Sequence, residues 1–176
     1  MAISTPTPPD GGKSADPLPQ REVLSTVAAQ VAAIDTLLGL ARHSIRVFDV
    51  DLSGMGWNSA ARAETITALL RSNPAATVEI IVHDTGWIER SCPRLLNILK
   101  FRGHAIAIRR TGPDAREAMD PLLIVDGVHF LHRFHASQPR AALSIGDPVA
   151  AQSLVTRFDA ISESAEPGVT PTVLGL

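Results

Sequence analysis

Short β-branched segments alternate along this chain with longer segments whose apolar residues recur at helical spacing, and this alternation restricts the fold more than any other feature. Strands are predicted over 45–51, 77–84 and 104–109, and helices over 22–42, 59–72 and 87–102. A strand, a helix and a second strand in this order form a right-handed crossover with parallel strands. The sequence therefore predicts an α/β fold with a mixed, mainly parallel sheet and helices on both faces.

The pattern changes after residue 121. Segments 122–125 and 128–134 are rich in β-branched and aromatic residues and flank Asp126-Gly127, which is typical of a hairpin. A short strand over 141–145 and a helix capped by Asp147 are predicted to follow. We expect one domain over 21–167, a proline-rich disordered tail over 1–20 and a C-terminal tail over 168–176.

Composition excludes several chemistries. Cys92 is the single cysteine, which excludes a disulfide scaffold and multi-thiolate metal sites, and we expect it to be a buried, inert thiol. Lys13 lies in the predicted tail and Lys100 follows no glycine-rich loop, so a P-loop is excluded. No apolar run reaches the roughly 18 residues of a membrane span, and no signal-peptide pattern opens the chain. We therefore expect a soluble cytoplasmic protein that does not bind membranes.

Polar residues at the ends of the predicted strands are the first catalytic candidates. Asp49 and Asp51 end the first of these strands, and His83 ends the next. Ligands of open α/β sheets bind beyond the carboxyl ends of strands, where two carboxylates and an imidazole suit Mg²⁺ or acid and base work. The alternative is that these acids accept backbone N–H groups of the following loops.

A second group of candidates surrounds the predicted hairpin. Alternation places His129, Arg133 and His135 on one face of the strand that follows Asp126. Arg133 could bind a phosphate or carboxylate with its guanidinium fork, and Asp126 would complete this ligand-binding set. His132 points to the opposite face, so three histidines cannot share one metal ion. A solvated edge strand explains the same pattern.

The segment 90–110 holds six basic residues and no acidic one. Such a run could attract nucleic acid through its charge, although Phe101 is its sole aromatic residue. Its members lie on different predicted elements, so they need not form one surface.

Segments 45–51, 82–84, 92–95 and 123–127 together resemble the phospholipase D-like superfamily. Aligning Asp126 with the aspartate of the family's H-x-K-x-x-x-x-D motif puts Met119 at the histidine and Pro121 at the lysine. The resemblance therefore implies a phospholipase D-like sandwich without the family's phosphohistidine chemistry or any cofactor. It implies a non-catalytic binding or assembly module that recognises an anionic, phosphate-containing ligand, and it also implies a homodimer. The pattern is also similar to a proteobacterial domain sometimes attached to acetyltransferases, which implies an acetyltransferase partner.

A competing resemblance concerns the haloacid dehalogenase-like phosphatases. Their D-x-D motif is approximated by Asp49-Val50-Asp51. It implies a Mg²⁺-dependent phosphatase in which Asp49 forms a phosphoaspartate and Asp51 is the acid and base. The family's late lysine and paired acids have no counterpart here.

Overall fold

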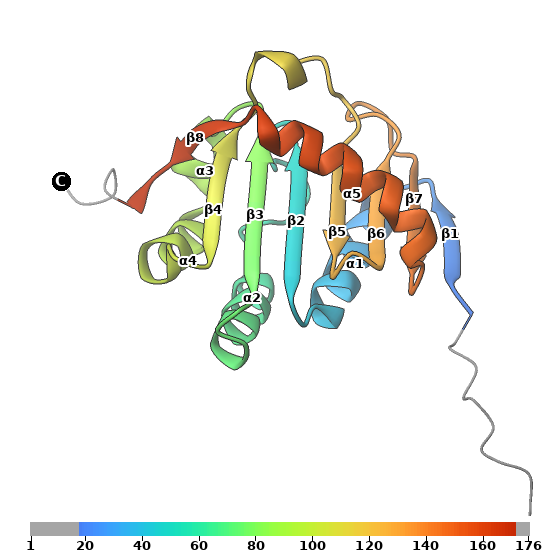
Figure 1. The fold of residues 1–176 in the computed structure, drawn as a ribbon, viewed down its shortest axis with the longest axis horizontal. Helices are drawn as coiled ribbons and strands as arrows, with labels where there is room; N and C mark the ends of the chain where they lie inside the picture. The colour runs from blue at the N-terminus through green and yellow to red at the C-terminus, as the bar shows by residue number, and fades with distance from the viewer. Residues whose placement is uncertain (1–17, 172–176) are drawn as a thin grey trace, which may run out of the picture.

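An eight-stranded sheet forms the centre of the protein in a computed structural model, which describes residues 18–171 (Figure 1). The strand order is β1-β7-β6-β5-β2-β3-β4-β8. The strands are β1 (Gln20–Leu24), β2 (Ser44–Asp49), β3 (Thr77–Val82), β4 (Ile106–Arg110), β5 (Leu122–Val125), β6 (His129–Arg133), β7 (Ala141–Ile145) and β8 (Glu166–Val169). The helices are α1 (Val27–Leu40), α2 (Ala60–Ser72), α3 (Gly86–Ser91), α4 (Pro93–Arg102) and α5 (Pro148–Glu163).

The sheet is mixed, as predicted, but its parallel part is small. The β2–β3 and β3–β4 pairs are parallel, and the other neighbouring pairs are antiparallel. The crossover rule correctly predicts the parallel pairing of β2 with β3 and of β3 with β4, because helices connect these strands. The second half of the chain returns through hairpins, so the sheet is not mainly parallel.

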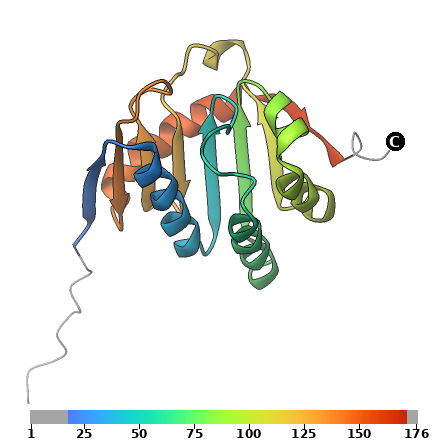
Figure 2. The same ribbon diagram turned by 180° about the vertical axis from the view of Figure 1, so that it is seen from behind.

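Helices cover both faces of the sheet, as the sequence predicts. Helix α5 crosses one face alone (Figure 1), and α1, α2, α3 and α4 cover the other (Figure 2). Two apolar clusters result, the larger beneath α1 to α4 and the smaller, with Phe48 and Phe158, beneath α5. Successive residues of a strand point to opposite faces, so each central strand contributes to both clusters.

Side chains cap the three longest helices. The hydroxyls of Thr26 and Ser59 accept hydrogen bonds from backbone N–H groups in the first turns of α1 and α2. The Asp147 carboxylate does the same for α5, as predicted, and also accepts from Arg21 of β1. The ion pair between Asp147 and Arg21 thus connects the start of α5 to the edge strand β1.

Three predicted boundaries are wrong. Residues 22–24 lie in β1, not in the first helix, because they pair with β7. The third predicted helix is two helices, since Cys92 leaves helical geometry before Pro93. Order does not end at Pro167, because β8 pairs with β4. Most of the predicted N-terminal tail, residues 1–17, and residues 172–176 lie outside the described residues.

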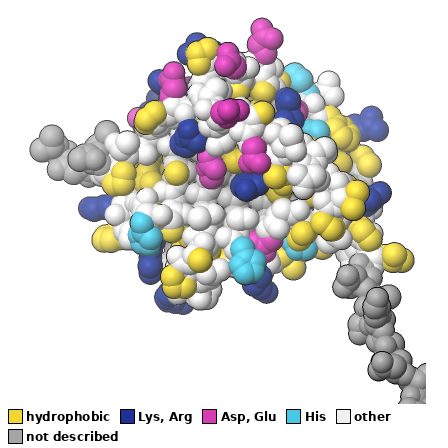
Figure 3. Space-filling view, viewed as in Figure 1, with side chains coloured by type: hydrophobic (Ala, Val, Ile, Leu, Met, Phe, Trp, Pro, Cys, Tyr) yellow, Lys and Arg dark blue, Asp and Glu magenta, His cyan; other side chains and the backbone are white. Residues whose placement is uncertain are grey.

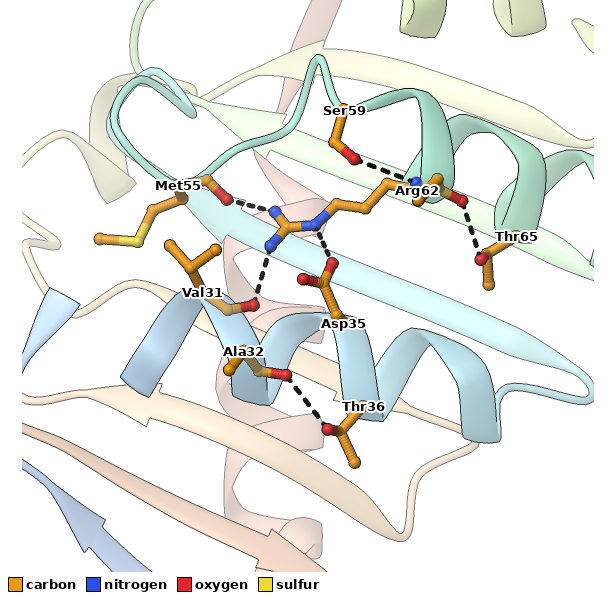
Figure 4. A network of polar contacts seen from close by, with 9 residues as sticks. Val31, Ala32, Asp35, Thr36, Met55, Ser59, Arg62 and Thr65 are labelled. Atoms are coloured by element: carbon orange, nitrogen blue, oxygen red, sulfur yellow. Dashed lines mark hydrogen bonds and ion pairs between the residues drawn. The ribbon is translucent and has the colours of Figure 1, made fainter. Parts of the chain in front are cut away.

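A buried arginine connects α1, α2 and the loop after β2 (Figure 4). The Arg62 guanidinium donates to the Asp35 carboxylate at 2.6 Å and to the carbonyls of Val31 and Met55. It also lies 5.4 Å from the centre of the Trp57 ring. Its charge and N–H groups are thereby satisfied although the side chain is only 2% exposed. The network fixes the 50–59 loop against the helices.

In the described part of the chain, the helices are too short or too polar to cross a membrane.

Candidate functional site

One edge of the sheet gathers most of the candidate residues. Strands β2, β3, β4 and β6 end at this edge and β5 begins there, because β5 runs antiparallel to both β2 and β6. The loop 111–121, with a short 3₁₀ helix at Pro113–Ala115, crosses the same edge at the top of Figure 1. We call it the carboxyl edge. Asp49, His83 and Arg133 all lie there, as the ends of their strands require.

Asp49 and Arg133 form a buried pair at this edge. Arg133 Nη1 lies 3.8 Å from Asp49 Oδ2, and Arg133 Nη2 donates to the Ala136 carbonyl at 2.6 Å. Burial raises the pKa of Asp49 to about 6, against the lowering effects of the Val50 N–H and of Arg133. Within residues 18–171, Arg133 Nε is buried with no hydrogen-bond partner. Arg133 is therefore not the exposed anion contact that the sequence suggests.

The space beside this pair is nearly filled. A cavity of about 20 Å³ is lined by Asp49, Arg133, Pro121, Met55 and Trp57, among others. Met55 and Trp57 come from the 50–59 loop and are almost fully buried. A cavity of this size holds about one water molecule. A phosphoryl group, with its oxygens around phosphorus, does not fit there without displacement of side chains.

Asp51 forms a turn in the same loop. Its Oδ1 accepts from the Ser53 backbone N–H at 2.8 Å and from the Ser53 hydroxyl at 2.7 Å. This is the backbone-capping alternative that the sequence left open. Across residues 18–171, no group of three or more His, Cys, Asp or Glu side chains is arranged to hold a metal ion. Asp49 and Asp51 thus gain no third ligand from a neighbouring strand.

His83 uses both ring nitrogens inside the protein. Nε2 lies 2.6 Å from the Ala118 carbonyl and Nδ1 lies 2.7 Å from Thr111 Oγ1. A carbonyl only accepts, so Nε2 carries a proton, whereas the Thr111 hydroxyl can donate to Nδ1 or accept from it. The ring also packs edge to face on Phe48, with centroids 5.3 Å apart. His83 therefore holds the 111–121 loop and has no free nitrogen for a substrate proton.

An open hollow lies beside His83. Its volume is about 450 Å³, and it is lined by His83, Arg110, Thr111 and Arg116. We call it the basic hollow. Sequence reasoning missed Thr111 and Arg116 as site residues. The rule that ligands bind beyond strand ends points to this loop, because it directly follows β4, but it does not say which of its side chains converge.

Two other candidates lie at the opposite edge. The Asp126 carboxylate accepts from the backbone N–H groups of Arg42, His43 and Ser44, each at 2.8 Å. His129 Nδ1 accepts from Gly146 N at 2.9 Å, and burial lowers the pKa of the imidazole. Asp126 and His129 therefore share no cleft with Arg133, contrary to the prediction of one ligand-binding set.

His135 lies at the carboxyl edge in a different hollow. This second hollow, of about 480 Å³, also contains Met119, Asp120, His132 and Phe134. The Asp120 carboxylate is held by the Arg157 guanidinium and lies 3.4 Å from His132 Nε2. His135 Nδ1 contacts the Ser137 hydroxyl at 2.8 Å. His135 and Arg133 thus lie at the same edge of the sheet, but they line different cavities.

The basic residues of segment 90–110 are dispersed. Arg94 of α4 donates to the Asn58 carbonyl, whereas Arg109 donates to Glu79 and to the Ala165 carbonyl. Over the α5 face, acidic and basic side chains alternate without a large patch of one sign (Figure 3). Cys92 is buried between α3 and α4, which confirms its predicted burial, and burial raises the pKa of its thiol.

Solved structures define the class of fold. Nuc from Salmonella typhimurium, a phospholipase D family member, is 16% identical with a TM-score of 0.62 over 87% of this chain and 100% of Nuc. TrmBL2, an archaeal chromatin protein, is 14% identical with a TM-score of 0.61 over 83% of this chain and 53% of its own. Phosphatidylserine synthase from Haemophilus influenzae Rd KW20 is 14% identical with a TM-score of 0.60 over 90% of this chain and 41% of its own. The chain thus spans about half of TrmBL2 and has the phospholipase D-like fold that its motifs suggested.

The chain belongs to the family described as Domain of unknown function (DUF7931), whose model matches residues 26–170. No curated protein matches the sequence significantly.

Proposed function

We propose that this protein is a non-catalytic phospholipase D-like module that binds a phosphate-containing anion and assembles with partner chains. The observation that carries the proposal is the cavity of about 20 Å³ beside Asp49, Arg133 and Pro121. This cavity lies where the resemblance aligns the family's catalytic lysine with Pro121. A site that holds about one water molecule has no room for a phosphoester.

The side chains at the aligned positions support the same proposal. Met119 and Pro121 directly precede β5 and carry no group that transfers a proton or attacks phosphorus. Arg133 occupies the stretch that aligns with the family's Gly-Ser and Asn, and its guanidinium faces Asp49. Asp49, Arg133, Met55 and Trp57 together replace a catalytic cleft with packed side chains.

Phosphoester hydrolysis tests the loss of catalysis. The full chain is incubated with p-nitrophenyl phosphate and with bis(p-nitrophenyl) phosphate, in Mg²⁺ and in EDTA, beside Asp49→Asn. We expect no turnover above that of the variant. Turnover that requires Mg²⁺ and disappears in Asp49→Asn would overturn the proposal and support the phosphatase alternative with Asp49 and Asp51.

Nucleic-acid binding is the weaker alternative. The fold is similar to that of TrmBL2, whose structure is described as showing a novel mode of DNA binding. In this chain Arg109 is engaged with Glu79 and the Ala165 carbonyl, and Arg94 donates to the Asn58 carbonyl. These contacts leave fewer free guanidinium groups for a polyphosphate backbone.

The assembly part of the proposal rests on the resemblance alone. Related proteins with one motif per chain pair their sites across a dimer, which supports a homodimer. The similarity to a domain sometimes attached to acetyltransferases supports an acetyltransferase partner. Light scattering after size exclusion measures the mass of the full chain. A mass near 18.7 kDa, that of one chain, at all concentrations would contradict the homodimer. Co-purification with an acetyltransferase encoded beside it would support the second partner.

A further inference from the structure

The side chains that line the basic hollow are cationic or neutral and polar. Arg110, Thr111, Arg116 and His83 line about 450 Å³, and no carboxylate belongs to this lining. The volume is within the range of small-molecule sites in proteins, which is roughly 300–1,000 Å³. Two guanidinium groups that face one open space favour a ligand of high negative charge.

Both guanidinium groups are accessible. Arg116 is exposed, and although its backbone N–H donates to the Pro113 carbonyl, its side chain makes no hydrogen bond or ion pair with any described residue. Arg110 Nη2 lies 3.2 Å from Glu166 Oε2, but both side chains are about half exposed. Exposed ion pairs of this kind are weak, so a ligand can replace Glu166 or share the guanidinium.

The loop that carries Arg116 is fixed at both ends. At its start, a Cβ on Gly112 would lie 2.0 Å from the Ser164 carbonyl oxygen, so the backbone of the loop packs directly on the end of α5. At its end, His83 Nε2 donates to the Ala118 carbonyl. Arg116 lies between these two anchors. The position of its backbone is therefore set before a ligand arrives, which lowers the entropic cost of binding.

We propose that the basic hollow binds the phosphate group of a small phosphate monoester through Arg110 and Arg116. This inference rests on the proposed anion-binding function and gives it a site and a ligand class. A monoester carries about −1.5 to −2 charges at pH 7, whereas a diester carries one. The two guanidinium groups therefore select the monoester over a nucleic-acid or phospholipid diester. His83 acts as a positioning residue, since both of its nitrogens are used to hold the loop and Thr111.

Calorimetric titration at pH 7.5 tests the site with three probes: inorganic phosphate, phenyl phosphate and dimethyl phosphate. We expect phenyl phosphate to bind about tenfold more tightly than dimethyl phosphate, because charged hydrogen bonds are lost with the diester. Arg116→Gln removes one positive charge from the basic hollow and should lower the affinity for phenyl phosphate about tenfold. Lys100→Gln is the matched control, because it removes one charge from exposed α4 outside the hollow.

The outcomes separate this site from the proposed function. About tenfold weaker phenyl phosphate binding by Arg116→Gln, with affinity unchanged in Lys100→Gln, supports the basic hollow. If both variants bind phenyl phosphate equally weakly, or if the wild-type chain binds phenyl phosphate and dimethyl phosphate equally well, the proposed site is wrong. Either outcome leaves the broader proposal of an anion-binding module standing. No binding of any probe by the wild-type chain also overturns the proposed site. Failure of the non-catalytic proposal is read separately, from turnover of the phosphoesters.

Discussion

Arg133 Nη1 lies 3.8 Å from Asp49 Oδ2, and both side chains are only 11% exposed. This distance is too long for a hydrogen bond, so the guanidinium compensates only part of the cost of burying the carboxylate. Burial accordingly raises the pKa of Asp49 to about 6. The carboxyl edge thus contains an acid whose charge opposes folding at neutral pH.

Asp49→Asn should change the pH dependence of stability. The unfolded chain releases the Asp49 proton near pH 3.8 and the folded chain near pH 6, so the contribution of Asp49 to stability falls as the pH rises from about 4 to 6. Asparagine does not titrate, and this loss, on the order of 3 kcal/mol, should be absent. Urea unfolding at pH 4, 5, 6 and 7 measures the difference between variant and wild type. Asp114→Asn, at an exposed carboxylate, is the control, and a difference independent of pH in Asp49→Asn would contradict the pKa.

Arg62 should be the most costly arginine to remove. Arg62→Ala leaves the carbonyls of Val31 and Met55 without donors and opens space beside Trp57, so we expect a loss of about 3 kcal/mol. Asp35 is 54% exposed, and Asp35→Ala should cost about 1 kcal/mol. Arg71→Ala, in the exposed last turn of α2, is the matched control. Similar denaturation midpoints for Arg62→Ala and Arg71→Ala would show that the network of Figure 4 is not needed for stability.

Two glycine substitutions should have opposite effects. In Gly112→Ala the new methyl group meets the Ser164 carbonyl, so we expect a loss of at least about 2 kcal/mol. Gly39 lies on the exposed side of α1 with no atom within 4 Å of an added Cβ. Gly39→Ala should therefore stabilise the protein by about 0.5–1 kcal/mol through helix propensity. Thermal unfolding measures the stability change of both variants. A melting temperature of Gly112→Ala equal to that of the wild type would mean that the 111–121 loop shifts freely.

Asp126 should matter for stability and not for anion binding. Asp126→Ala leaves three backbone N–H groups without their acceptor, which we expect to cost about 2–3 kcal/mol. Asp126→Asn keeps one carbonyl oxygen and tolerates the positive φ of 54° at this position, so it should cost less. Phenyl phosphate titration of the folded Asn variant is the second readout. Weaker binding there would restore the sequence-based assignment of Asp126 to the ligand-binding set.

The strands of the central sheet could be predicted because their signal is local. The β-branched runs at β2 and β3 and the Asp126-Gly127 turn carry strand and hairpin preferences within a few residues. The error at residues 22–24 has a physical reason too. Val23 continues the apolar spacing of α1, and only the unpaired edge of β7 makes a strand the better state for it.

The sequence by itself determined the α/β class, the strand-end positions of Asp49 and His83, and the replacement of the motif's histidine and lysine by Met119 and Pro121. The tertiary structure alone decided which polar residues meet. Asp49 ends one apolar strand and Asp126 follows another, yet they lie at opposite edges because β5 returns antiparallel to β2. Arg116 reaches the basic hollow because distant groups, Ser164 and His83, hold its loop. Strand preference depends on neighbouring residues, whereas a binding site depends on contacts between segments that the sequence does not place together.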